Sequence, residues 1–177
     1  MVSMILVGFK GCGKSTVGRA LANLLGWEFY DTDKRVEKQF HELDGSSLSC
    51  REICALHGED KFRFFEQVAV QSILPQSPAI IATGGGTIIS QSCIDHLKKL
   101  GKMVYLDCGW QALEHRFESG PTPSFVPKKS PMPALKELYV RRKPIYHDIA
   151  DYEVSVEGKT VDNIVNEIME NIKQARV

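Results

Sequence analysis

The 177-residue sequence has no excess of either charge, because 22 lysines and arginines balance 22 aspartates and glutamates. Without a basic or acidic surplus, nothing in the composition indicates nucleic acid or an anionic membrane as a partner. A long apolar run is also missing. The first residues, MVSMILVGFKG, have no basic segment, and their apolar run is too short for a signal peptide or a membrane span. We therefore expect a cytoplasmic protein.

Cysteines are few and do not suggest a disulfide framework. An odd number of them, scattered in mostly apolar surroundings, is typical of reduced thiols in an oxidant-poor compartment. The pair at Cys50 and Cys54 has no second pair and no neighbouring histidine cluster, so packing explains it better than metal binding. The five are Cys12, Cys50, Cys54, Cys93 and Cys108.

The remaining composition, 43% hydrophobic and 25% charged, is that of one globular domain spanning residues 1–177. Short apolar runs predict strands at 3–8, 27–31, 79–83, 102–107 and 151–156. Helical spacing predicts helices at 14–25, 32–40, 50–58, 59–74, 110–117, 134–142 and 161–175, one ending over 94–100, and a polar loop at 41–49. Strands that alternate with helices favour an α/β fold whose parallel sheet is covered on both faces.

The stretch GFKGCGKST, residues 8–16, matches the pattern G-x-x-x-x-G-K-[ST] between an expected strand and an expected helix. Its glycines let consecutive backbone N–H groups turn toward a polyphosphate, and the helix adds its positive N-terminal end. Lys14 is placed to reach the β and γ oxygens, and the Ser15 hydroxyl to reach Mg²⁺. This motif predicts nucleotide binding but does not identify an acceptor.

The stretch DTD ends the second expected strand and places two carboxylates, Asp31 and Asp33, at the edge where parallel sheets bind ligands. One carboxylate can serve the metal's water shell and the other a substrate hydroxyl. Such a stretch is also a common helix N-cap with a solvated acid, and the residues alone leave both interpretations open.

Arginines and glycines supply the remaining candidate site. Arg63 lies one position off an apolar helix face, so it can reach the crevice or form a surface pair with Glu66. Three glycines, 84–86, follow a buried strand and favour close approach to a ligand. Arg141 and Arg142 offer planar forks that match a carboxylate. Together these features favour a compact polyhydroxy carboxylic acid as the acceptor.

From GFKGCGKST through DTD, GEDKFRFFE, ATGGG and RRKPIY to the final helix, the chain resembles a shikimate kinase. The resemblance implies a P-loop, adenylate-kinase-like α/β/α fold with a five-stranded parallel sheet. It implies transfer of the ATP γ-phosphoryl group to the 3-hydroxyl of shikimate in chorismate and aromatic amino acid biosynthesis. The implied partners are ATP, shikimate and Mg²⁺, for a protein that we expect to be a monomer.

The resemblance also implies residue roles. Lys14 and Asp33 are implied as catalytic, with Asp33 acting on the attacking hydroxyl either as a base or as an orienting group. The other implied groups are a metal pair, Ser15 and Asp31 (through water), a substrate-binding subdomain at 33–62 and a lid at 117–133. The implied ATP-binding residues are Gly11, Cys12, Gly13, Lys14, Ser15, Thr16 and Arg116, with Arg116 against the adenine. The implied shikimate-binding residues are Asp33, Arg63, Gly84, Gly85, Gly86 and Arg142.

The proline-rich stretch SGPTPSFVPKKSPMP holds five of the eight prolines and falls within the expected lid, so we do not interpret it as a domain linker. Members of the family usually carry a lid arginine near the position of Thr122–Pro123, where this chain has none. We hypothesise that Lys128 or Lys129 replaces that charge. The loop at 41–49 is longer than is usual for the family.

Two other functions remain open at this stage. One is a P-loop kinase of another small hydroxy acid such as gluconate, although the paired arginines and the three glycines disfavour it. The other is a nucleotide-binding module with little turnover, suggested by the missing lid arginine. Against that module, Lys14, Ser15, Asp31 and Asp33 are all present.

Overall fold

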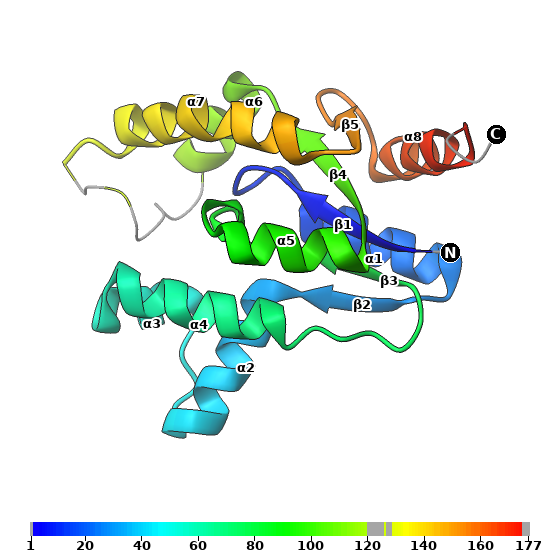
Figure 1. The fold of residues 1–177 in the computed structure, drawn as a ribbon. Coiled ribbons are helices and arrows are strands. Elements are labelled where there is room, and N and C mark those ends of the chain that lie inside the picture. The colour runs from blue at the N-terminus through cyan, green and yellow to red at the C-terminus, as the bar shows by residue number, and fades with distance from the viewer. Residues whose placement is uncertain (1, 120–125, 127–128, 175–177) are drawn as a thin grey trace.

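A single parallel sheet organises the computed structural model, which describes residues 2–119, 126 and 129–174 (Figure 1). The strands follow the order β2-β3-β1-β4-β5, and every neighbouring pair is parallel. The prediction of a five-stranded parallel sheet is confirmed. The strands are β1 (Ser3–Val7), β2 (Glu28–Asp31), β3 (Ala79–Ala82), β4 (Gly101–Asp107) and β5 (Tyr152–Ser155).

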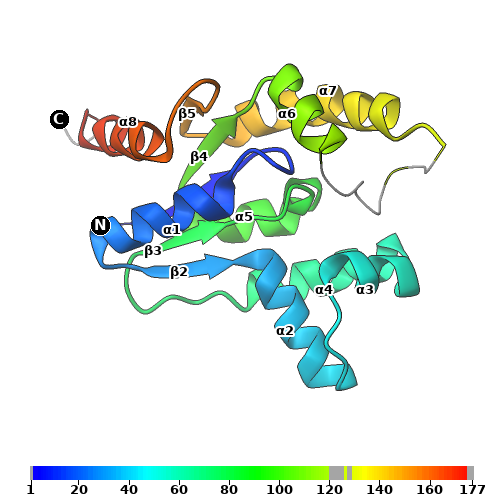
Figure 2. The ribbon, with the colours of Figure 1, turned by 180° about the vertical axis from the view of Figure 1, so that it is seen from behind.

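Helices cover both faces of this sheet, as the alternating pattern predicted (Figures 1 and 2). Helices α1 and α8 pack on one face, and α5 and α7 pack on the other. The helices are α1 (Lys14–Leu25), α2 (Thr32–Asp44), α3 (Cys50–His57), α4 (Glu59–Gln71), α5 (Gln91–Leu100), α6 (Trp110–Glu118), α7 (Pro131–Ile149) and α8 (Val161–Gln174), with a short 3₁₀ turn at Thr87–Ile89.

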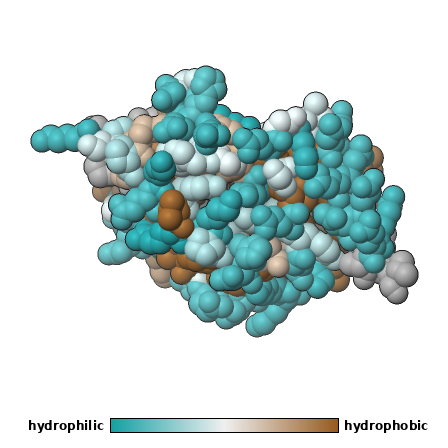
Figure 3. Space-filling model, turned by 90° about the horizontal axis from the view of Figure 1, so that it is seen from above, coloured by the Kyte–Doolittle hydropathy of each residue, from teal (hydrophilic) through white to brown (hydrophobic). Residues whose placement is uncertain are grey.

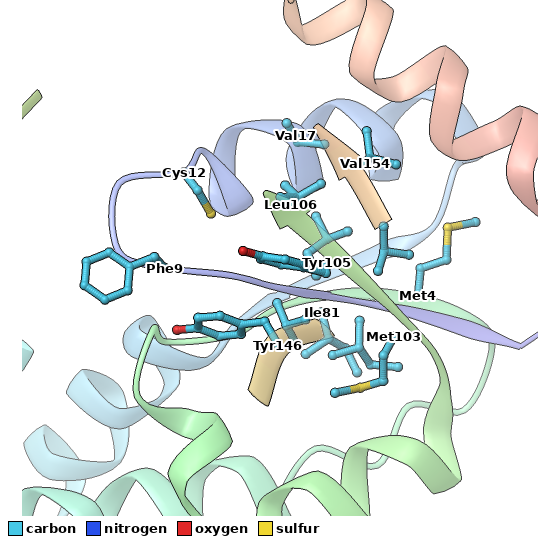
Figure 4. Packing of buried hydrophobic residues seen from close by; sticks show 14 of the residues in the cluster. Met4, Phe9, Cys12, Val17, Ile81, Met103, Tyr105, Leu106, Tyr146 and Val154 are labelled. Carbon is cyan, nitrogen blue, oxygen red and sulfur yellow. The ribbon is translucent and has the colours of Figure 1, made fainter. Parts of the chain in front are cut away.

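The central strands are continuous apolar runs because both of their faces are covered. Every residue of β1 and β3 is buried, and the register pairs Met4 with Ile80 and Leu6 with Ala82. Across the core, the rings of Tyr105 and Tyr146 stack with centroids 5.3 Å apart (Figure 4). This stacking fixes α7 against β4, below the carboxyl ends of the strands.

A second, smaller apolar cluster lies between α2, α3 and α4, which are at the carboxyl ends of the strands. It consists of Val36, Phe40, Ile53, Phe62 and Ala69, all buried. This cluster holds the three helices together independently of the main core. Four of its residues fall within the region 33–62 expected to bind substrate and Ala69 lies beyond it, so a separate substrate-binding subdomain stays a prediction.

Three expected helices had wrong bounds. The helix expected at 59–74 ends at Gln71. Residues 41–44 continue helix α2 rather than forming part of a polar loop, and the helix ends at Gly45, which adopts φ 75° and donates its N–H to His41 O at 2.8 Å. Exposed polar residues had concealed the last turn. Helix α7 also runs beyond 134–142 to both sides, through Pro144. Pro144 lies on the exposed face, where water can replace the hydrogen bond it removes.

The expected lid begins and ends in helices. Phe117 and Glu118 belong to α6, and 131–133 form the first turn of α7, where prolines are tolerated because those N–H groups have no helical partner. Between them, Val126 is buried in the main core. Thr122, Pro123 and Lys128 lie outside the described residues.

The face of the molecule in Figure 3 is largely hydrophilic, with apolar residues in small separate groups. All five cysteines are free. None of the helices in the described ranges has the length and apolar character needed to cross a membrane.

Candidate active site

The turn between β1 and α1 forms a cradle of backbone donors. Gly11 and Gly13 have φ values of 85° and 96°, which other residues rarely adopt. Gly13 is the N-cap of α1 and provides no side-chain cap, so the first N–H groups of the helix are left without an intrahelical partner. Ser15 and Thr16 follow in this turn and line a cavity that they share with Asp31 and Asp33. The arrangement suits an anion at the helix N-terminus.

Lys14 is buried beneath this turn, with 7% of its surface exposed. Its ammonium donates to Gly8 O at 2.8 Å and to Phe9 O at 2.9 Å, and it lies 3.6 Å from Cys12 Sγ. The lysine therefore stabilises the loop by binding two of the loop's carbonyl groups, and it brings a positive charge to the cradle.

Asp31 has two roles at once. Its Oδ1 accepts from the backbone N–H groups of Asp33 and Lys34, which makes it the N-cap of α2, and its Oδ2 accepts from Ser15 Oγ at 2.7 Å. The sequence left a cap and a functional acid as alternatives, and the geometry allows both. A hydroxyl and a carboxylate this close are the oxygen ligands that Mg²⁺ uses beside phosphates, so the pair fits that ion.

Asp33 lies deeper in the cavity, at the start of α2. Burial, followed by the negative charges of Asp31 and Glu66, raises the pKa of Asp33 to about 6, against opposing effects from Lys14 and Lys10. A carboxylate with this pKa is ionised at pH 7 and is basic enough to accept a proton or to hold a hydroxyl group.

Arg63, on α4, pairs with its own helix and also lines the cavity. Its guanidinium donates to Glu66 Oε2 at 2.7 Å and to Glu59 Oε1 at 3.1 Å. Glu66 is buried, and its other oxygen accepts from Thr87 Oγ1 at 2.8 Å. Arg63 therefore both lines the crevice and pairs with Glu66, but this pair lies in the cavity wall and not on the surface. Glu66 fixes the guanidinium and ties it to the turn after the glycines.

The three glycines after β3 allow the charged side chains of Asp33 and Arg63 to lie directly against the backbone of the loop. A Cβ on Gly84 would lie 2.5 Å from Asp33 Oδ1, and a Cβ on Gly86 would overlap the Arg63 guanidinium. The N–H of Gly84 donates to Thr32 Oγ1 at 2.7 Å, which fastens the loop to α2. These positions need glycine for space, because any side chain would displace the charged groups beside them.

Of the two neighbouring arginines on α7, Arg142 is buried in the cavity wall and Arg141 is exposed. Arg142 donates to Gly85 O at 3.1 Å, and the Tyr146 hydroxyl donates to the same oxygen. Burial lowers the pKa of Arg142, and the positive charges of Arg63 and Arg141 lower it further. Two cationic forks that repel each other in one cavity create a site for an anion.

Arg116 lies outside this cavity. It is exposed at the end of α6 and donates to Gly11 O, beside the cradle. Of the two lysines expected to act from the lid, Lys129 is exposed, and Lys128 lies outside the described residues. Their role, and that of Arg116, stays a prediction.

These groups surround one cavity of about 390 Å³, to which the cradle, the DTD stretch, α4 and the glycine loop all contribute. The stretches that follow β1, β2 and β3 therefore meet at one edge of the sheet, the edge where parallel sheets bind ligands. Sequence reasoning missed that Glu66 joins Arg63 to Thr87. It also missed the Thr32 hydroxyl, which accepts from Gly84, and the Tyr146 hydroxyl, which donates to Gly85. It also missed Lys10, which lines the cavity from the cradle. Only Lys10 had a local signal, as a charged residue within the phosphate-binding motif.

A nucleotide cradle that opens onto a small, cation-lined acceptor cavity defines a P-loop phosphotransferase. The family model for shikimate kinase matches residues 10–173. The chain is 33% identical to a shikimate kinase from Pseudoalteromonas atlantica over 172 residues, which are 97% of each chain. It belongs to the shikimate kinase family and is an ATP-dependent small-molecule kinase.

Solved structures of shikimate kinases have the same fold as this chain. A shikimate kinase from Acinetobacter baumannii in complex with shikimate superposes with a TM-score of 0.86 and 29% identity, covering 100% of this chain and 96% of that one. A gluconokinase from Sinorhizobium meliloti shares the fold, with a TM-score of 0.59 and 20% identity over 98% of this chain and 93% of that one.

Proposed function

We propose that this chain transfers the γ-phosphoryl group of ATP to the 3-hydroxyl of shikimate. One observation carries the proposal: Arg63 and Arg142 converge with Asp33 in a single cavity that opens on the phosphate cradle. Two guanidinium groups need an anion, and a basic carboxylate beside them needs a hydroxyl. A small ring that carries a carboxylate and several hydroxyls meets both requirements.

The size of the cavity supports a compact acceptor. About 390 Å³ lies at the lower end of the range for ligand pockets, and part of this volume belongs to the phosphate cradle, so the part beside Asp33, Arg63 and Arg142 suits one small ring. In the proposed complex, Arg63 and Arg142 hold the carboxylate and Asp33 holds the hydroxyls. The glycine loop 84–86 lets the ring approach the backbone. Glu66 keeps the Arg63 fork in place.

On the donor side, the phosphates occupy the N-terminal turn of α1. The amides of residues 11–16 and the Lys14 ammonium stabilise their charge, and the Arg116 guanidinium lies against the adenine. Ser15 and, through water, Asp31 would hold Mg²⁺, which would supply charge neutralisation for the phosphates.

In the proposed step, the acceptor hydroxyl oxygen forms a bond to the γ-phosphorus while the bond to the β–γ bridging oxygen breaks. The bridging oxygen keeps the electron pair and leaves with ADP. The hydroxyl proton passes to the Asp33 carboxylate and from there to solvent. The protein forms no covalent bond, so its contribution is position and charge.

The test measures ADP release by a coupled assay in the presence and absence of shikimate, for the wild type and for Asp33→Asn and Arg63→Ala. We expect shikimate-dependent release that Asp33→Asn reduces by roughly 10²- to 10⁴-fold, the usual range for an acid–base group. Arg63→Ala should mainly raise the KM for shikimate, since it removes a binding contact.

Gluconate serves as the comparison acceptor, because a gluconokinase shares the fold. Faster ADP release with gluconate than with shikimate contradicts the proposed acceptor. Release that is the same with and without shikimate, or tight ATP binding with no turnover, contradicts the proposed reaction.

A further inference from the structure

The glycine loop at residues 84–86 is the part of the acceptor cavity that its own sequence fixes least. Glycine adopts more backbone conformations than any other residue, so three in a row do not hold one peptide orientation by themselves. Side-chain hydroxyls hold both ends of the loop. The N–H of Gly84 donates to Thr32 Oγ1 at 2.7 Å, and Thr87 Oγ1, which follows the loop, donates to Glu66 Oε1 at 2.8 Å. The middle of the loop needs a support of its own.

Helix α7 supplies that support. Arg142 and Tyr146 lie about one turn apart on α7, so their side chains share a face, and both donate to the carbonyl oxygen of Gly85. Arg142 also lines the cavity, where it is assigned to the acceptor's carboxylate. Tyr146 lies in the main core, so its bond to Gly85 does not depend on what occupies the cavity. Of the two donors, Tyr146 is the constant one.

The position of the Tyr146 hydroxyl is set by the central sheet. The ring stacks on Tyr105 of β4, with centroids 5.3 Å apart and planes 17° apart (Figure 4). Only 1% of Tyr146 is exposed, and this burial raises the pKa of its hydroxyl, which therefore keeps its proton and acts as a donor. A rigid ring thus carries the position of β4 to the carbonyl of Gly85.

The direction of this carbonyl also decides where the next N–H points. In a trans peptide, the C=O of one residue and the N–H of the following residue point in opposite directions. None of the peptides in the described ranges is cis. Because Gly85 O is directed at Tyr146, the N–H of Gly86 is directed away from Tyr146, and Gly86 lines the cavity.

We infer that Tyr146 is a positioning residue for the acceptor. Its hydroxyl holds the Gly85 carbonyl, so that the Gly86 N–H is presented to the acceptor. The same bond leaves the Arg142 guanidinium available for the acceptor's carboxylate, because Arg142 is then not the sole support of the loop. Tyr146 takes no part in moving the proton. This inference rests on the proposed function, since it concerns how that acceptor site keeps its shape.

The test compares Tyr146→Phe with Tyr105→Phe in the full chain. Phenylalanine keeps the ring and its stacking and removes only the hydroxyl. For Tyr146→Phe we expect the KM for shikimate to rise roughly three- to tenfold, the effect of one lost hydrogen bond, while the KM for ATP stays within about twofold. Amide hydrogen exchange at residues 84–86, followed by mass spectrometry, should become faster because the loop loses its support.

Tyr105→Phe is the matched control. Tyr105 belongs to the same stacked pair, but its hydroxyl donates to Asp107 Oδ1 at 2.8 Å, on its own strand rather than on the loop. This variant also loses one buried hydroxyl bond, so its thermal midpoint should fall by an amount similar to that of Tyr146→Phe. Its KM for shikimate and its exchange at 84–86 should stay those of the wild type.

The outcomes separate this inference from the proposed function. If the wild type is active, a KM for shikimate that rises less than about threefold in Tyr146→Phe overturns the role of Tyr146 alone. An equal rise in Tyr105→Phe, or an equal rise in the KM for ATP, does the same, because either result indicates general packing. A wild type without shikimate-dependent ADP release overturns the proposed function instead, and the role of Tyr146 with it.

Discussion

Glu66 provides a sharp test of how the acceptor site is held together. Glu66→Gln keeps the shape of the side chain and removes one charge from a buried pair, in which Glu66 accepts from Arg63 at 2.7 Å and from Thr87 at 2.8 Å. The amide can still bond both partners, so the loss is the difference between charged and neutral hydrogen bonds, roughly 1–2 kcal/mol. For a chain of this size we expect the thermal midpoint to fall by roughly 2–8 °C.

The same change acts on catalysis through two groups. The bond that fixes the Arg63 fork loses its charge and becomes weaker, so the KM for shikimate should rise by up to about tenfold, equivalent to about 1.4 kcal/mol. Glu66 is also one of the negative charges that raise the pKa of Asp33. Removing that charge lowers this pKa, so the acidic limb of the kcat/KM profile should move to lower pH.

Glu59→Gln is the matched control, because Glu59 pairs with the same guanidinium at 3.1 Å but is 59% exposed. Exposed ion pairs contribute little to stability, so the thermal midpoint of Glu59→Gln should change by no more than about 2 °C and its KM for shikimate should stay unchanged. The assays are calorimetric melting and shikimate-dependent ADP release between pH 5 and 8. If Glu66→Gln matches Glu59→Gln in midpoint, KM and pH profile, the reasoning about Glu66 is refuted.

Three further predictions concern the same cavity. Gly86→Ala puts a methyl group into the Arg63 guanidinium, so the KM for shikimate should rise at least about tenfold, whereas Gly109→Ala, next to an exposed surface carboxylate, should leave it unchanged. Asp33 has a folded pKa of about 6, raised above its ordinary value, so its charge destabilises the fold increasingly as pH rises from about 4 to 6. At pH 7, Asp33→Asn should therefore raise the free energy of unfolding by up to about 3 kcal/mol and melt at a higher temperature than the wild type. At pH 3 the two proteins should melt at the same temperature. A lower melting temperature of Asp33→Asn at pH 7 contradicts this reasoning. Asp31→Asn keeps the cap of α2 but removes a charge from the metal pair, so kinetic titration should show a higher Mg²⁺ requirement with little change in melting.

Local patterns were sufficient for most of the fold. Continuous apolar runs predicted the buried strands, and glycines marked the ends of α1 and α3 as observed. The largest error occurred where tertiary context overrides a local signal. Helix α7 passes through Pro144, which local rules treat as a stop, because packing against β4 and α6 holds the helix on both sides of it.

The candidate site divides in the same way. The phosphate cradle was visible in the sequence because its geometry depends on residues close together in the chain, glycines with positive φ followed by a helix N-terminus. For Asp31 the sequence left a helix cap and a functional acid as alternatives. Only the structure shows that it caps α2 and also accepts from Ser15, since that contact joins the end of β2 to the turn after β1.

What the sequence by itself determined is therefore the parallel sheet, the cradle and the residue types that an anionic, hydroxyl-bearing acceptor requires. The resemblance had named Arg142, and the tertiary structure gives the reason, since Arg142 rather than Arg141 lines the cavity. The tertiary structure alone decided that Glu66 orients Arg63 and that Lys10 packs against the glycine loop. The physical reason is that motifs record local backbone geometry. The burial that raises the pKa of Asp33, and the charges that compensate it, depend on side chains brought together from distant segments.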